Sequence, residues 1–275
     1  MKFSFVYTMR YQHFLFMPSG NTYHPIHYFP FFTCISWQGF SFHVCNSMLA
    51  FLLSKRFLSG LTQVHITHVS GAVRLRLQCR KPLAIKAGQY INLWIPEVNF
   101  WSFLQSHPFV VISWAEQSQD HLEPFIEPRR GITRKLLHHA KNGRSVHSLV
   151  LFSGPHGNSI RMDDCENILM VASDFGIAAQ LPYLKQLIHG YNTRKLRTQR
   201  IHLVWQVRDI DVTIAVQPLI NGALSEDTLD DGWILDISIY CESRDTTVSS
   251  GKRASVSLAR PQYMILSKKK FQRGR

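Results

Sequence analysis

Cysteine is scarce and unpatterned in this chain of 275 residues. The five cysteines lie far apart and form no Cys-x-x-Cys pair: Cys34, Cys45, Cys79, Cys165 and Cys241. This spacing indicates neither a zinc site nor the disulfide framework of a small secreted domain. With 45% hydrophobic and 12% aromatic residues, the chain can form one large or two ordinary domains, and intrinsic disorder is excluded.

Acidic residues are also few, because 18 Asp and Glu stand against 31 Lys and Arg, which gives a formal net charge of +13. Such a balance suits nucleic acid, an anionic membrane surface or an anionic small molecule, and charge alone does not choose between them. Much of the positive charge lies in a cluster at residues 194–200 and in the tail at 268–275. We expect solvated surface there, and no nucleic-acid interface.

Charged residues are absent between Arg10 and Lys55, where aromatic and aliphatic residues abound. This composition predicts that residues 1–58 form an apolar segment that contacts a bilayer or a hydrophobic partner. Prolines and glycines interrupt the segment, so the best candidate for a spanning helix, which needs about 20 apolar residues, runs from Phe40 to Phe57. The sequence leaves open whether this segment is inserted in a membrane.

Residues 59–160 have the pattern of a small antiparallel β-barrel. VHITHVSGAVRLRLQCRKP alternates polar and apolar residues around Ser70-Gly71 and predicts a hairpin, while GQYINLWIP and PFVVISW predict further strands. Several short strands at this spacing are typical of a barrel. One helix interrupts them, because RRGITRKLLHHAKNG begins after Gly131 and ends at Gly143.

Residues 161–275 have a different periodicity. ENILMVAS is a continuous apolar run, typical of a buried parallel strand, and AAQLPYLKQLIHG predicts an amphipathic helix that ends at Gly190. RIHLVWQV and WILDISIYC predict two more buried strands. This order predicts a parallel sheet whose ligand binds at the carboxyl ends of the strands. The predicted fold is therefore a β-barrel followed by an α/β domain of nucleotide-binding type.

An ordered series of motifs resembles the flavin and nicotinamide portion of fungal ferric-chelate reductases, which are relatives of the NADPH oxidases and plant ferredoxin reductases. The motifs are residues 88–114, RRGITRKLL, SGPHG, ILMVASDFGIAAQLPYLKQL and RIHLVWQVRD. The resemblance implies a ferredoxin-reductase-like fold, with an FAD-binding barrel before a Rossmann-like NAD(P)-binding domain. It also implies that NADPH passes electrons through FAD to haem or a ferric chelate, as in iron or copper reduction at the plasma membrane.

The resemblance places FAD against the barrel. His107, Pro108 and Phe109 form the motif that packs along the flavin, and Ser113 is a candidate contact to its diphosphate or ribitol. In physical terms, an extended strand offers backbone groups to the polar edge of the ring while an aromatic side chain covers its face. Val110 stands where many relatives have a hydroxyl, so we expect no hydrogen bond from this position to the reactive edge of the flavin.

Two further groups of residues complete the predicted cofactor contacts. Gly131 and Thr133 open a helix beside several arginines, and both the helix dipole and the guanidinium groups favour the FAD pyrophosphate. Gly154, Pro155 and Gly157 are expected to form the turn before the nucleotide domain, where the family contacts both cofactors. No catalytic acid, base or nucleophile is assigned, because the flavin carries the chemistry.

The turn after the first α/β strand raises a difficulty for NADPH. Relatives have a glycine-rich turn here, whereas this chain keeps Gly176 but has Ser173 and Asp174 beside it. A carboxylate at this point repels a phosphate and adds bulk where the backbone must approach the dinucleotide. Either Asp174 points away or NADPH binding is weakened. Arg208, just after the second α/β strand, is a candidate contact to a 2′-phosphate.

The two ends of the chain depart from the family pattern. Full-length relatives bind haem through histidines on spanning helices, but prolines separate His13 from His27, so we expect no haem here. The expected last strand is not recognisable after SIYCES. These departures predict a truncated chain and leave two alternatives to reductase activity. One is an inactive remnant that binds FAD or a membrane partner, and the other is an NADPH oxidase-like donor to oxygen.

Overall fold

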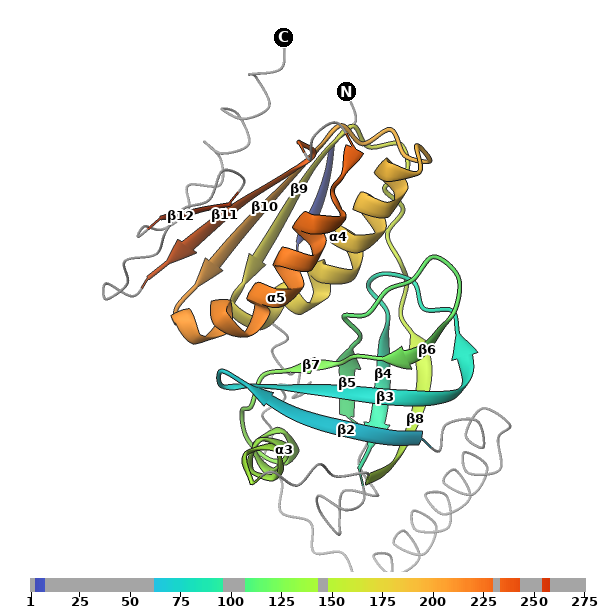
Figure 1. Cartoon of the computed structure of the whole chain (residues 1–275), viewed down its shortest axis with the longest axis vertical. Coiled ribbons are helices and arrows are strands. Elements are labelled where there is room, and N and C mark those ends of the chain that lie inside the picture. The colour runs from blue at the N-terminus through green and yellow to red at the C-terminus, as the bar shows by residue number, and fades with distance from the viewer. Residues whose placement is uncertain are drawn as a thin grey trace, which may run out of the picture.

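The computed structural model describes residues 3–7, 62–95, 107–142, 148–229, 233–242 and 254–257 (Figure 1). Within them, an antiparallel sheet is followed along the chain by a parallel sheet, except that one edge strand of the parallel sheet, Phe3–Tyr7, comes first in the sequence. This arrangement confirms the predicted fold class.

The antiparallel sheet forms the barrel, with the strand order β5-β4-β8-β2-β3-β6 and with β7 paired to β3. Its strands are β2 (Thr62–Val69), β3 (Ala72–Leu83), β4 (Tyr90–Trp94), β5 (His107–Val110), β6 (Gln119–Leu122), β7 (Phe125–Ile126) and β8 (Ser148–His156). The predicted hairpin joins β2 to β3. Ser70 and Gly71 have φ of 40° and 78°, and two left-handed residues in succession give a turn that matches the twist of the paired strands.

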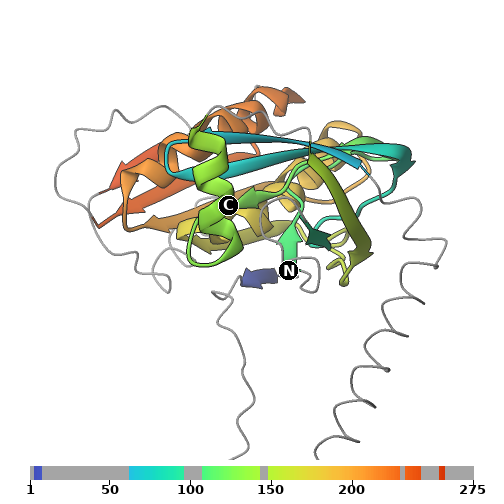
Figure 2. The same ribbon diagram turned by 90° about the horizontal axis from the view of Figure 1, so that it is seen from below.

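Alternating apolar side chains build the core of the barrel. Leu75, Leu77, Ile91 and Leu93 are fully buried, as expected for the inward face of strands with a period of two. Helix α3 (Ile132–Lys141) packs against β2 and β3 (Figure 2) and buries Leu136. The helix therefore holds its N-terminus at a fixed place beside the barrel.

The parallel sheet has the strand order β1-β9-β10-β11-β12. Its central elements are β9 (Asn167–Ser173), α4 (Ile177–Asn192), β10 (Arg200–Val207), α5 (Ile210–Glu226) and β11 (Leu235–Cys241). Helices α4 and α5 lie side by side on one face of the sheet (Figure 1). Two successive right-handed crossovers in the same direction place them there.

The two edge strands of this sheet were not predicted. β1 (Phe3–Tyr7) pairs in parallel with β9, although the sequence pattern assigned it to the apolar segment 1–58. β12 (Ala254–Ser257) pairs in parallel with β11, although no last strand was recognisable. A short edge strand has one neighbour only and needs no long apolar run. The predicted membrane segment Phe40–Phe57 lies outside the described residues, and none of the described helices is long and apolar enough to cross a bilayer.

Two details of the helices also differ from the prediction. Helix α4 continues past Gly190 to Asn192, because this glycine serves packing and does not end the helix. A Cβ at position 190 would lie 2.4 Å from Leu196 Cδ1. Helix α5 was not predicted, although it has an N-cap at Asp209, whose side chain accepts a hydrogen bond from the N–H of Asp211 at 3.3 Å.

Helix α4 also fixes the junction between the two sheets. The hydroxyl of Tyr183 accepts a hydrogen bond from the N–H of Ile160 at 3.1 Å. It also fills the space beside Gly88 in the β3–β4 loop, where an added Cβ would lie only 2.2 Å from the hydroxyl oxygen. Helix α4 is thereby held against the barrel.

Candidate functional site

A cavity of about 210 Å³ lies where the carboxyl end of β9 meets the barrel. The barrel contributes Pro108, Phe109, Val110, Phe125, Ile126, Glu127, Arg129 and Thr133, and the parallel-sheet domain contributes Ser173, Asp174, Phe175, Gly176, Ala178 and Ala179. Ligands of open α/β sheets bind beyond the carboxyl ends of the strands. The cavity is therefore the leading candidate for a binding site.

Strand β5 supplies one wall of this cavity. Pro108, Phe109 and Val110 line it, and β5 is held there by antiparallel pairing with β4. Phe109 is 9% exposed, so most of its ring packs in the barrel core. His107 is not among the lining residues, and burial lowers the pKa of its imidazole, which favours the neutral form.

Ser113 does not contribute to this wall. Its side chain is buried, and its Oγ accepts a hydrogen bond from the N–H of Glu123 at 3.2 Å. The hydroxyl therefore joins two segments of the barrel, and the structure does not bring it to the cavity with Phe109.

The start of α3 supplies the polar part of the barrel wall. The N–H of Arg129 donates to Thr133 Oγ1 at 2.9 Å, and this hydroxyl donates to the carbonyl of Arg130 at 3.2 Å. Arg129 Nη2 lies 2.6 Å from Glu127 Oε2. Gly131 caps the helix at φ 67° and is not a lining residue, but its conformation sets the direction in which the first turn of α3 faces.

The end of β8 lies apart from the cavity, and the turn predicted at Gly154, Pro155 and Gly157 is wrong in its bounds. Strand β8 continues to His156 and includes the first two of these residues. Its register with β4 shifts beside Tyr90. Both glycines have left-handed backbone angles, and a Cβ at Gly154 would lie 3.2 Å from the carbonyl oxygen of Tyr90. The glycines thus permit an irregular strand pair.

The turn after β9 answers the question raised by Asp174. Its carboxylate accepts hydrogen bonds from the backbone N–H of Arg208 at 3.0 Å and from the Nε of the same residue at 2.8 Å. The carbonyl of Asp174 accepts from Trp205 Nε1 at 2.9 Å. The side chain therefore points across to the end of β10, and Arg208, the predicted 2′-phosphate contact, compensates its charge.

Two aromatic residues of the cavity were missed by sequence reasoning. The rings of Phe125 and Phe175 stack with their centroids 5.5 Å apart and their planes at 25°. Phe125 belongs to the two-residue strand β7 and Phe175 to the turn after β9, so neither lies in a segment with a readable period. The stacked pair joins the two sides of the cavity and gives it an apolar, aromatic surface.

The combined surface suits a planar, anionic cofactor. An aromatic ring system can lie against apolar side chains, and its anionic groups can approach Arg129 and the first turn of α3. Within the described ranges, no cluster of three or more His, Cys, Asp and Glu residues is placed to hold a metal ion.

Comparison with protein families and known proteins supports this interpretation of the fold. Residues 60–160 match an FAD-binding domain, and residues 165–269 match the ferric reductase NAD binding domain. In Saccharomyces cerevisiae, "Ferric/cupric reductase transmembrane component 2" is 27% identical over 149 residues, which is 52% of this chain and 20% of that protein. "Ferric reductase transmembrane component 5" is 30% identical over 128 residues, or 46% and 18% of the two chains. The match thus spans a fifth or less of these relatives.

Solved structures with the same fold are more distant in sequence. A ferredoxin NADP+ reductase from Neisseria gonorrhoeae, solved with FAD and NADP, has a TM-score of 0.53 at 15% identity, covering 80% of this chain and 79% of its own. The flavohem-like FAD/NAD binding domain of a nitric oxide dioxygenase from Vibrio cholerae has a TM-score of 0.51 at 11% identity, covering 74% and 81%. At these identities the similarity concerns the fold alone.

Proposed function

Because this chain belongs to the ferric reductase family of FAD- and NAD-binding oxidoreductases, we propose that it passes electrons from NADPH through FAD to a ferric chelate or haem. The observation that carries the proposal is the shared cavity, which β5 and α3 line from the barrel and the β9 turn lines from the parallel sheet. A nicotinamide and a flavin must be held together for hydride transfer, and a cavity with one wall from each domain provides that proximity.

We assign the flavin to the barrel wall. Pro108 to Val110 would lie along the ring, Arg129 and Thr133 would bind the pyrophosphate, and Gly131 would orient the turn that presents them. Bound FAD supplies the chemistry, since it accepts a hydride and passes on single electrons. His107, Ser113, Gly154, Pro155 and Gly157 remain predicted contacts, although none of them lines the cavity.

The nicotinamide nucleotide is assigned to the turn of Ser173–Gly176. Asp174 directs its carboxylate to Arg208, so the repulsion of a phosphate is smaller than the sequence implies. The Arg208 side chain is still 56% exposed and can meet a further anion, which favours NADPH over NADH in this proposal.

A second candidate function is flavin binding without reduction by NADPH. It is favoured by the turn itself, where Asp174 takes a left-handed φ of 45° and Phe175 stacks on Phe125 inside the cavity. Both features lie in the turn that is assigned to the nicotinamide nucleotide. In that case the protein would act as a flavin-binding partner and not as a reductase.

Anaerobic reduction of the bound flavin tests both candidates. The purified chain is reconstituted with FAD, and its absorbance at about 450 nm, a property of the flavin, is recorded before and after NADPH is added. Bleaching supports the reductase, and bound but unbleached flavin supports the second candidate. If bleaching occurs, the acceptor is identified by adding a ferric chelate and measuring ferrous iron, or by adding oxygen and measuring superoxide.

We also propose that the protein is associated with the plasma membrane. The matched yeast relatives are named transmembrane components, and the first 58 residues of this chain form an apolar, almost uncharged segment. Fractionation of cells that express the full chain tests this location, and recovery in the soluble fraction would contradict it.

A further inference from the structure

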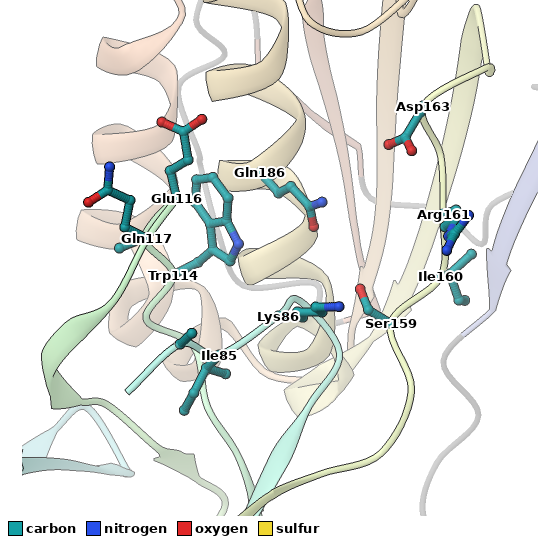
Figure 3. A pocket seen from close by; sticks show the side chains of 12 residues that line it. Ile85, Lys86, Trp114, Glu116, Gln117, Ser159, Ile160, Arg161, Asp163 and Gln186 are labelled. Atoms are coloured by element: carbon teal, nitrogen blue, oxygen red, sulfur yellow. The ribbon is translucent and has the colours of Figure 1, made fainter. Parts of the chain in front are cut away.

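A second cavity, of about 310 Å³, lies between the barrel loops and helix α4 (Figure 3). It is lined by residues 84–86 of the β3–β4 loop, residues 114–117 after β5, part of the segment 159–163, and Gln186 of α4. The segment 159–163 precedes β9, whereas the first cavity reaches the carboxyl end of β9, and the two cavities share no lining residue. The two cavities are therefore separate sites.

Among the described residues, one buried side-chain atom that lines this cavity lacks a hydrogen-bond partner. Gln186 Oε1 is buried and accepts no hydrogen bond from the described residues. Leaving a buried acceptor unsatisfied is unfavourable, so such atoms call for an explanation. Because Gln186 lines the cavity, a ligand with an N–H donor would satisfy this atom.

Two cationic side chains of the same cavity also have no ion-pair partner among the described residues. The side chains of Lys86 and Arg161 form no ion pair with the described residues. In contrast, the carboxylate of the nearby Glu116 is paired with Lys195, and its Oε2 lies 3.5 Å from His189 Nε2. With the charge of Glu116 compensated, the two free cations outnumber the single remaining carboxylate, that of Asp163. This balance favours an anionic ligand.

The side chains that can bind the parts of a ligand lie at different places in this cavity. Figure 3 shows the indole of Trp114 and the amide of Gln186 on one side, Arg161 and Asp163 on the other, and Lys86 between them. A flat aromatic group can stack on an indole, a carboxylate can accept hydrogen bonds from sugar hydroxyls, and cations bind phosphate.

We propose that this cavity binds an adenine mononucleotide. The base stacks on Trp114, its amino group donates to Gln186 Oε1, the ribose lies toward Asp163, and the phosphate is bound by Lys86 and Arg161. The walls come from the barrel, the connecting segment and α4, so an occupied site holds the two domains together. The site does not depend on the function proposed for the first cavity.

Calorimetric titration of the full chain with AMP, in the presence of saturating FAD and NADP+, tests the proposal. FAD and NADP+ fill the first cavity under these conditions. The AMP binding that we expect therefore reports on the second cavity. IMP carries a carbonyl acceptor in place of the amino donor of adenine, so IMP is expected to bind about tenfold more weakly. Absence of AMP binding at millimolar concentration would overturn the proposal. AMP binding that is seen without NADP+ and lost in its presence would also overturn it.

Two sets of variants test separately the contact assigned to the base of AMP and the contacts assigned to its phosphate. Gln186→Leu should abolish the difference between AMP and IMP, and the pair Lys86→Gln and Arg161→Gln should weaken AMP at least about tenfold. The control pair Lys135→Gln and Lys141→Gln removes the same charge from α3 and should leave AMP binding unchanged. An equal loss in the control pair, or an AMP preference that survives Gln186→Leu, would contradict the assigned contacts.

Discussion

The two helices whose first turns border the first cavity differ in the charge placed at their N-termini. Helix α3 has no acidic residue in its first turn and is preceded by Arg129. Helix α4 is preceded by Asp174, whose carboxylate is held by Arg208. A helix N-terminus favours an anion. The carboxylate near α3, that of Glu127, is paired with Arg129 before the helix, whereas the carboxylate near α4, that of Asp174, lies in the turn that leads directly into the helix.

This difference separates the two binding steps of the proposed function, that of the flavin and that of the nicotinamide nucleotide. The barrel side presents Arg129, Thr133 and the first turn of α3 to the cavity, and the turn at residues 174–176 contains an ion pair and an aromatic contact. The comparison predicts that the chain binds FAD more tightly than the nicotinamide nucleotide. Substitutions can alter the two walls separately.

The largest expected effect concerns the barrel wall. Arg129→Ala removes the guanidinium assigned to the FAD pyrophosphate and should weaken FAD about 10- to 100-fold, the range of a lost charge-assisted hydrogen bond. Fluorescence titration of the purified chain with FAD measures this. Lys141→Ala, at the far end of α3, is the control. Equal FAD affinities for the native chain, Arg129→Ala and Lys141→Ala would place the pyrophosphate elsewhere.

A smaller, opposite effect is expected at the nucleotide wall. Asp174→Gly removes the carboxylate at a left-handed position that glycine adopts freely, and should tighten NADP+ about tenfold. Asp174→Asn removes the charge and keeps the bulk, so it should give part of the gain. Equilibrium dialysis with NADP+ measures both variants. Unchanged or weaker binding in Asp174→Gly would show that the pair with Arg208 shapes the turn productively.

The contact between the walls should contribute modestly to stability. A double-mutant cycle of Phe125→Leu and Phe175→Leu is expected to give a coupling of about 0.5–1.5 kcal/mol in the free energy of unfolding, the range for a stacked pair. Urea denaturation measures it. Additive effects of the two substitutions would mean that the rings do not interact in solution.

The smallest effect concerns pH and the barrel. Burial lowers the pKa of His107, so between this lowered value and the pKa of about 6.5 usual for histidine the unfolded chain binds more protons than the folded chain. Stability should therefore fall as the pH decreases through this window. Urea denaturation at a pH above and a pH below the window should show a larger loss for the native chain than for His107→Gln. The same loss in both proteins would assign the pH dependence to other groups.

Sequence reasoning succeeded where one local signal was sufficient. The β2–β3 hairpin, α3 and the three central parallel strands follow from periodicity, turn residues and apolar runs. Of the predicted cofactor residues, Pro108, Phe109, Thr133 and Gly176 line the first cavity. Phe125 and Phe175 were missed because their meeting depends on the packing of two domains, which no periodicity within one segment reports.

The sequence by itself determined the class of fold, the order of the two domains and the cofactors implied by their motifs. These features depend on the order of short patterns along the chain. Tertiary structure alone decided where the Asp174 carboxylate points, that β1 and β12 complete the parallel sheet, and that Lys86, Trp114, Arg161 and Gln186 share a cavity. The physical reason is that partners far apart in sequence, such as Asp174 and Arg208, are brought together only when the strands that carry them pair.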